Sequence, residues 1–152
     1  NPIHDARLHA MLLYRTPQSL TAKFNSERND NQNSYKVESW LLHHGEKLTD
    51  RFELSAYKLM NHLLKTIGEN TTENDLQEFA KISTTKIHQI AINSDYFFAP
   101  NENIKTHNLL SSITNNLSYH EINSIHGHDA FLIEYERLNH ILKTIFNTKH
   151  TN

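Results

Sequence analysis

The strongest constraint on the fold comes from two short segments in the second half of the chain, residues 86–92 and residues 117–122. The first, KIHQIAI, is a β-branched run with polar residues on both sides, which is typical of a buried strand. We interpret the second, LSYHEI, as another strand. A helix is expected between them, over residues 99–113, so this order predicts parallel strands joined by a right-handed crossover.

Two further helices are expected around these strands. One is short, over residues 75–81, and the other closes the chain. The apolar residues of the closing helix recur at steps of four and three, and they are Phe131, Tyr135, Leu138, Leu142 and Ile145. The order helix–strand–helix–strand–helix defines an α/β fold class. Because two strands do not make a stable sheet alone, we expect this half to be the closing edge of a larger α/β sheet.

The first part of the chain has helical patterns only. Residues 6–24 fit two short helices with a break at Thr16-Pro17. Residues 25–34 contain no apolar side chain, which predicts an exposed loop. Residues 35–67 have the spacing of an amphipathic helical pair, so we expect this part of the chain to be all-helical.

A polar linker, residues 68–74, separates the part with helical patterns only from the part with predicted strands. We therefore divide the chain into a helical region, residues 1–74, and a strand-containing region, residues 75–152. Just before the linker, one helix carries an apolar stripe formed by Ala56, Met60, Leu63 and Ile67. Such a stripe is typical of a core or of a subunit interface, rather than of a cofactor-binding segment.

Composition argues against several classes of function. Fifteen Lys and Arg face 17 Asp and Glu, so the formal net charge is −2 and no basic excess is available to neutralise a nucleic-acid backbone. The absence of Cys excludes disulfides, thiolate metal sites and cysteine nucleophiles. No apolar run approaches the ~18 residues of a membrane span, and the first five residues lack the features of a secretion signal. We therefore expect a soluble, cytoplasmic protein with no nucleic-acid or membrane partner.

The three glycines, Gly45, Gly68 and Gly127, are far apart. Walker loops, dinucleotide-binding GxGxxG turns and the G-x-S-x-G nucleophile elbow need at least two glycines within a few residues, so the sequence contains none of them. The chain also begins with Asn1-Pro2 rather than Met. This start suggests a processed or truncated piece of a larger protein.

Two reactive side chains follow the predicted strands. Asp95 comes after the first strand and His128 comes after the second. Because the carboxyl ends of parallel strands meet on one rim of a sheet, the two side chains should lie together, with the carboxylate accepting from Nδ1 and Nε2 free to act as a base. The alternatives are that Asp95 only forms a turn and that His128 is only a loop residue.

Four motifs carry a family resemblance. They are Tyr14-Arg15-Thr16, residues 37–52 (V-E-S-W-L…G-E-K…R-F), residues 93–100 (N-S-D-Y-F-F-A-P) and residues 124–132 (S-I-H-G-H-D-A-F-L). In this order they resemble elements of the homoserine O-acetyltransferases, acyltransferases with the α/β-hydrolase fold. The resemblance covers nearly all of the chain but about the carboxyl-terminal half of a family member. It implies a partial α/β-hydrolase fold, with carboxyl-terminal parallel strands and helices in residues 75–152 and a helical lid in residues 1–74.

The resemblance implies a Ser-Asp-His triad in which Asp95 is the acid and His128 is the general base. The nucleophilic serine would lie in the missing amino-terminal half of the enzyme, so this chain alone should be inactive. The family transfers an acetyl group from acetyl-CoA to the hydroxyl of L-homoserine in methionine biosynthesis. It therefore implies acetyl-CoA as a co-substrate and no tightly bound cofactor.

Three more residues match family elements. Asp129 matches the position that contacts the amino-acid substrate, and the resemblance implies a contact with the ammonium group of that substrate. The side chain is also a candidate N-cap of the closing helix. Tyr14 and Arg15 match an element near the lid. An Arg at a helix end is more often a surface or ion-pair residue, so their role stays unassigned.

The twelve histidines raise the alternative of a metal site. His126, His128 and Asp95 could supply three ligands on adjacent loops. His43 and His44 would diverge by about 100° on a helix, and no third ligand stands four residues from either. A polar, solvated surface explains these histidines more simply, and we expect no metal.

Two functions from different classes remain open. The first is the lid and carboxyl-terminal part of a homoserine O-acetyltransferase, which pairs two copies through its lid helices as a homodimer. The second is a catalytically silent helical interaction module derived from the same fold. An upstream G-x-S-x-G after a predicted strand would favour the first function.

Overall fold

The computed structural model describes residues 1–31 and 33–147. Residue 32, within the predicted loop, and residues 148–152, at the end of the predicted second region, lie outside the described residues.

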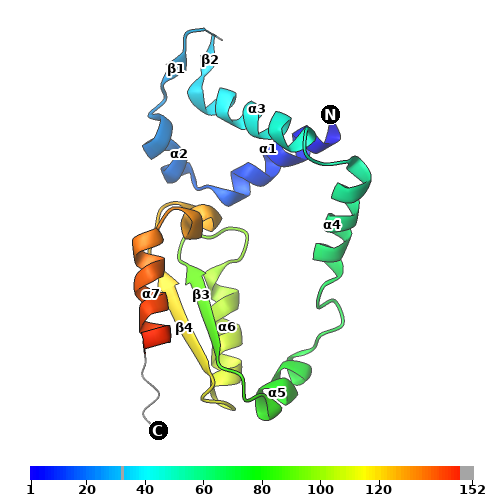
Figure 1. Ribbon diagram of the computed structural model, residues 1–152, viewed down its shortest axis with the longest axis vertical. Coiled ribbons are helices and arrows are strands. Elements are labelled where there is room, and N and C mark those ends of the chain that lie inside the picture. The colour runs from blue at the N-terminus through cyan, green and yellow to red at the C-terminus, as the bar shows by residue number, and fades with distance from the viewer. Residues whose placement is uncertain (32, 148–152) are drawn as a thin grey trace. The chain divides into compact units, whose positions relative to one another are not determined.

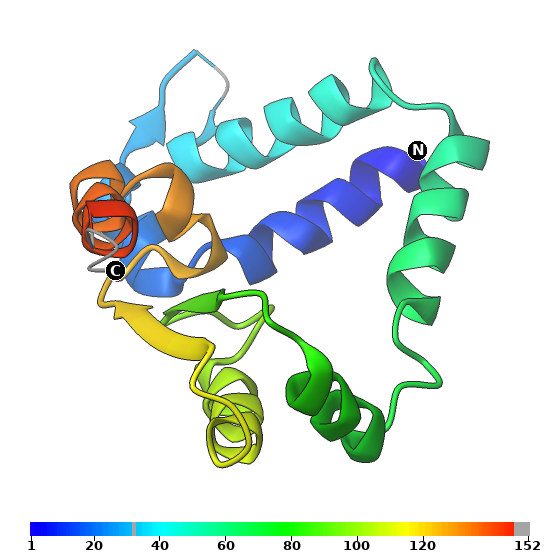
Figure 2. The ribbon, with the colours of Figure 1, turned by 60° about the horizontal axis from the view of Figure 1, so that its bottom comes forward.

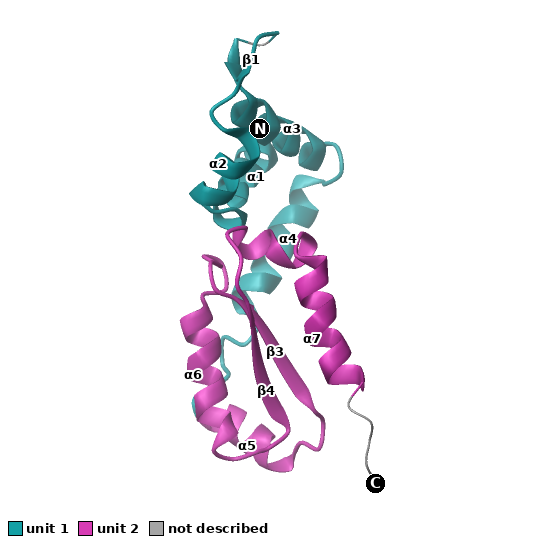
Figure 3. Ribbon diagram, turned by 90° about the vertical axis from the view of Figure 1, so that its left-hand side faces the viewer, with its two compact units in different colours: residues 1–73 teal, residues 74–152 magenta. Residues whose placement is uncertain are grey.

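The chain divides into two compact units, residues 1–73 (unit 1) and residues 74–152 (unit 2), as Figure 3 shows in two colours. The division falls in the polar linker that the sequence indicates.

Unit 1 is built from helices and one small hairpin. Its elements are α1 (Pro2–Tyr14), α2 (Pro17–Phe24), β1 (Arg28–Asn29), β2 (Ser34–Tyr35), α3 (Lys36–Thr49) and α4 (Leu54–Thr66). Proline stands in the first turn of both α1 and α2, where its missing N–H costs no hydrogen bond. The side chains of Asn1 and Thr16 cap these helices by accepting from the backbone N–H groups of Ile3 and Ser19, both at 3.0 Å.

The hairpin corrects the expectation of an all-helical region, whereas the described residues of segment 25–34 are exposed as expected, except for the half-buried Asn29 and Ser34. β1 and β2 pair antiparallel, with Arg28 opposite Tyr35 and Asn29 opposite Ser34. Asn25 is left-handed at the end of α2, with φ of 44°. A ladder of two residues per strand is too short to show the alternation that identifies a strand in a sequence.

α1 and α3 lie side by side in unit 1 (Figure 2). Gly45 of α3 is buried at their crossing, where an added Cβ would come within 2.4 Å of His4 Cδ2 and 2.6 Å of Leu8 Cδ1. The absence of a side chain at this position therefore allows the close approach of the two helices.

A cluster of rings joins α2 to α3. The ring of Trp40 lies 5.5 Å from that of Phe24 and 4.6 Å from that of His44, and the ammonium of Lys23 lies 4.9 Å from the centre of the Trp40 ring. Burial and the nearby charge of Arg7 lower the pKa of His44. The neutral imidazole is therefore the favoured form inside this cluster.

The apolar stripe of α4 is not part of a core within the described residues. Met60, Leu63 and Ile67 are 57%, 52% and 78% exposed, and Ala56 is exposed as well. The interpretation of the stripe as core is therefore wrong for this chain, and an interface with another molecule remains a prediction.

Unit 2 has the mixed architecture that the sequence predicts. Its elements are α5 (Glu73–Ile82), whose first residue is the last of unit 1, β3 (Ile87–Ile92), α6 (Pro100–Ser111), β4 (Leu117–Ile122), the 3₁₀ helix η1 (Gly127–Leu132) and α7 (Tyr135–Asn147). β3 and β4 pair parallel and in register from Ile87–Leu117 to Ile92–Ile122. The strands lie between α6 and α7 (Figure 1), which is compatible with an α/β fold.

The core of unit 2 sits on the α7 side of the strands. Ile92, Ile122 and Ala130 are buried there, and Ile90, Leu138 and Ile141 pack against them. The sheet of described residues contains β3 and β4 only, so each strand has one edge without a strand partner in this part of the chain.

The closing helix begins later than the sequence predicts. Residues 127–132 form η1, and α7 starts at Tyr135, so Phe131 precedes the helix. Gly127, the first residue of η1, has φ of 67°, a conformation that few residues other than glycine adopt. Asp129 lies inside η1 and is not the N-cap of α7, which corrects that expectation.

We expect Gly45→Ala to lower the free energy of unfolding by about 1 kcal/mol, the middle of the net range that follows from two opposed effects. Alanine in a helix interior gains about 1 kcal/mol over glycine, but overpacking against α1 costs about 1–3 kcal/mol. The added methyl group must displace both His4 and Leu8. Urea unfolding followed by circular dichroism measures the change.

Glu46→Ala is the matched control, because Glu46 is the next residue of α3 and is exposed. It should change stability by less than about 0.5 kcal/mol. Truncation of His4 to alanine in the Gly45→Ala background should recover part of the loss. Unchanged or increased stability of Gly45→Ala alone would contradict close packing of α1 and α3 at this position.

Candidate active site

Asp95 is placed by the turn that ends β3. Its backbone N–H donates to the carbonyl of Ile92 at 3.1 Å. Its carboxylate Oδ1 accepts from the backbone N–H groups of Phe97 at 2.7 Å and Phe98 at 2.9 Å. The side chain is only 6% exposed, so these hydrogen bonds satisfy one oxygen of a buried carboxylate.

The second carboxylate oxygen faces the imidazole of His128. Nδ1 of His128 lies 2.9 Å from Oδ2 of Asp95, between residues 33 positions apart in the sequence. This is the contact that the parallel strand order predicts. Because an ionised carboxylate only accepts hydrogen bonds, Nδ1 carries the proton, and in the neutral imidazole Nε2 is the basic nitrogen.

Three aromatic rings surround the imidazole. The ring centres of Phe97, Phe98 and Phe131 lie 5.3, 5.4 and 5.7 Å from that of His128. These contacts hold the imidazole plane in place and reduce the local polarity, which strengthens its interaction with the carboxylate.

A cavity of about 360 Å³ opens beside this pair. Most of its lining is apolar, and the polar residues on its wall are Asp95, Asn103 and His128. An apolar cavity with a few convergent polar groups is the usual form of a small-molecule site.

Two residues that the sequence reasoning did not single out fix the loop that carries His128. Oδ1 of Asn93 accepts from the backbone N–H of Ser124 at 2.8 Å, and Oγ of Ser94 accepts from that of Gly127 at 3.0 Å. Both residues directly follow β3, where short polar side chains reach the loop after the neighbouring strand. In the sequence, the feature that could have identified these two residues is their position directly before Asp95.

The remaining candidate residues are in two places. Asp129 is half-buried within η1, next to His128. Tyr14 ends α1 in unit 1, where the guanidinium of Arg7 lies 5.4 Å from the centre of its ring. Arg15 follows it and is only 8% exposed, so the interpretation of Arg15 as a surface residue is wrong.

The metal alternative of the sequence analysis concerns His126, His128 and Asp95. Among residues 1–31 and 33–147, no group of three or more His, Asp or Glu side chains is arranged to hold a metal ion. Nδ1 of His128 is hydrogen-bonded to the carboxylate of Asp95. Within the same described part, no helix has the length and apolar character that crossing a bilayer requires.

A carboxylate–imidazole pair beyond the carboxyl ends of parallel strands is the acid–base arrangement of nucleophilic acyl-transfer and hydrolytic enzymes. Comparison with known proteins points to one such group. The chain is 30% identical to the homoserine O-acetyltransferase of Methanococcus vannielii over 95% of its own length. It is 33% identical to that of Nostoc punctiforme over 91% and 31% identical to that of Salinibacter ruber over 95%.

The chain therefore is similar to homoserine O-acetyltransferases along nearly its whole length, which confirms the resemblance that the motifs indicate. It spans 30%, 39% and 40% of the length of these three relatives. It is thus similar to a segment of such an enzyme. No protein-family model matches the chain.

We expect Ser94→Ala to accelerate hydrogen exchange at the backbone amide of Gly127 about two- to tenfold, because one hydrogen bond contributes about 0.5–1.5 kcal/mol. Amide exchange followed by NMR measures the rate. Ser111→Ala is the control, because Ser111 is exposed at the end of α6 and donates to the carbonyl of Asn108 in the same helix. An unchanged rate at Gly127 in Ser94→Ala would contradict this role of Ser94.

Proposed function

We propose that this chain supplies the acid–base pair and the lid of a homoserine O-acetyltransferase, which transfers an acetyl group from acetyl-CoA to the hydroxyl of L-homoserine. The observation that carries the proposal is the 2.9 Å contact between His128 Nδ1 and Asp95 Oδ2, in a chain similar to these enzymes over more than nine-tenths of its length. The whole enzyme would be an α/β-hydrolase-fold protein that works in methionine biosynthesis in the cytoplasm. Unit 2 would complete its sheet.

In the first half-reaction, Nε2 of His128 takes the proton of a serine hydroxyl supplied by a part of the enzyme that this sequence does not contain. The serine oxygen attacks the thioester carbon of acetyl-CoA, the carbon–sulfur bond breaks, and the leaving thiolate takes the proton from Nε2. The negative carboxylate of Asp95 stabilises the imidazolium while the proton resides on His128. The product is an acetylated serine and free CoA.

In the second half-reaction, the same nitrogen deprotonates the hydroxyl of homoserine. The new oxygen–carbon bond forms as the bond to the serine oxygen breaks, and the serine regains its proton from His128. The donors that stabilise the oxyanion of both intermediates would come from the rest of the enzyme. No step requires a tightly bound cofactor.

Asp129 is the candidate contact for the ammonium group of homoserine, because it is an acidic side chain directly beside His128. Tyr14 and Arg15 are candidates for a role near the lid. The burial of Arg15 favours such a role over that of a surface charge.

We expect the 152-residue chain alone to have no acyltransferase activity, since it contains no nucleophile elbow. In the full-length enzyme, His128→Ala should lower kcat by about 10³-fold or more and Asp95→Asn by about 10²–10⁴-fold. Release of CoA in the presence of L-homoserine measures the rate.

His140→Ala is the matched control, because His140 is exposed on α7 and outside the site. It should retain activity. Turnover by the isolated chain, or a fully active His128→Ala enzyme, would refute the proposed function.

We also propose that α4 pairs with α4 of a second copy. The exposed apolar side chains on this helix form one continuous surface, and they are Leu59, Met60, Leu63, Leu64 and, just past its end, Ile67. An exposed apolar patch of this kind is typical of a protein interface.

Sedimentation should show a dimer, and Met60→Glu combined with Leu63→Glu should make the protein monomeric, because buried carboxylates would face each other across the interface. Lys58→Glu, an exposed polar position on the same helix, is the control and should leave the dimer intact. A monomeric parent protein would contradict the pairing.

A further inference from the structure

Three polar side chains meet near the amino-terminal ends of the two parallel strands. His88 belongs to β3, and Ser118 and His120 belong to β4. Nδ1 of His88 lies 2.6 Å from Oγ of Ser118, and Nε2 of His120 lies 3.1 Å from the same oxygen. One hydroxyl therefore bridges two imidazoles.

This cluster is separate from the candidate active site. His88 is the second residue of β3, whereas Asp95 follows the other end of that strand. The register places His88 opposite Ser118 and Ile90 opposite His120, so the cluster shares the face on which α7 packs.

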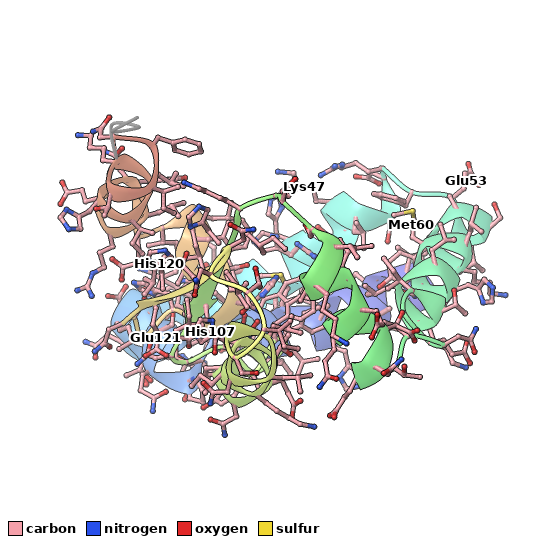
Figure 4. All side chains as sticks on the ribbon, turned by 90° about the horizontal axis from the view of Figure 1, so that it is seen from below. Lys47, Glu53, Met60, His107, His120 and Glu121 are labelled. Atoms are coloured by element: carbon pink, nitrogen blue, oxygen red, sulfur yellow. The ribbon has the colours of Figure 1, made fainter. Side chains whose placement is uncertain are left out.

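The nearest acidic residue in the sequence, Glu121, faces the other way. It accepts from the hydroxyl of Tyr119 at 2.7 Å, and burial together with this carboxylate raises the pKa of Tyr119 to about 12. The ring of His107, on α6, lies 5.8 Å from that of Tyr119. Figure 4 shows His120 on the α7 side of β4 and His107 on the α6 side.

The two imidazoles lie close enough for one ion to bind both. A nitrogen of each ring is directed at Oγ of Ser118, and the ring centres are 5.9 Å apart. Zinc binds imidazole nitrogen at about 2.0–2.1 Å, which puts the centres of two rings on one ion about 5–6 Å apart. His88 is exposed and its two partners are half-buried, so an ion can reach the site from solvent.

We propose that His88 and His120, with the hydroxyl of Ser118 as a third donor, bind a divalent transition-metal ion of the zinc class. Imidazole nitrogen suits zinc, copper and nickel, whereas magnesium and calcium prefer several oxygen ligands. Water completes the coordination, because the cluster contains two imidazoles and falls short of a group of three His, Asp or Glu ligands among the described residues. The site does not depend on the proposed acyltransferase function.

The test is a titration of the ¹⁵N-labelled chain with Zn²⁺, followed by long-range ¹H–¹⁵N NMR of the histidine rings. Nδ1 of His88 and Nε2 of His120 should shift together and saturate at one equivalent of zinc. This readout needs no variant, so it remains decisive if a substitution disturbs folding. Mg²⁺ should cause no shift.

Variants then assign the ligands. His88→Ala and His120→Ala should each weaken zinc binding at least tenfold, and Ser118→Ala, which keeps both imidazoles, should weaken it less. His62→Ala is the control, because His62 is exposed on α4, and it should leave the affinity unchanged. Unmoved His88 and His120 resonances at one equivalent, or zinc taken up first by other histidines, would overturn the proposal.

Discussion

The parallel pairing of β3 with β4 is the interaction on which the candidate site depends. Its register aligns Ile92 with Ile122, and the backbone N–H of Asn93 extends the ladder by donating to the carbonyl of Ile122 at 3.1 Å. Two strands alone are marginally stable in water, so the pairing relies on the side chains that cover it. Ile122 is 2% exposed and Ala130, in η1, is fully buried, which ties the segment bearing His128 to the end of the sheet.

The carboxylate of Asp95 has two roles, one in the turn after β3 and one in the pair with His128. Because Oδ1 holds the backbone of the segment after β3 and Oδ2 holds the imidazole, the same carboxylate shapes the loop and orients His128. The interpretations of Asp95 as a turn residue and as a partner of histidine are therefore compatible. A neutral amide here would keep one acceptor but would lose the negative charge that favours a protonated imidazole.

Structure could be predicted from the sequence where a residue pattern repeats along a whole helix or strand. It could not be predicted where the local structure depends on one short turn or on one contact between distant residues. β-branched runs and helical spacing predict β3, β4 and their parallel order, because burial of a whole segment leaves a periodic signal. The hairpin at Arg28–Tyr35 and the 3₁₀ turn at Gly127 are too short for periodicity, so local turn chemistry decided both. The buried position of Gly45 depends on His4 and Leu8, about 40 residues away, and such long-range packing has no local signature.

One register governs both ends of the sheet. A shift of β4 by one residue would turn its side chains to the opposite face, so Ser118 and His120 would leave the α7 side and Ile122 would leave the core. The nearly complete burial of Ile122 opposes that shift, because exposing it would cost about 1.5–3 kcal/mol. The apolar contact that fixes the rim bearing Asp95 and His128 therefore also holds His88 opposite Ser118 at the other end.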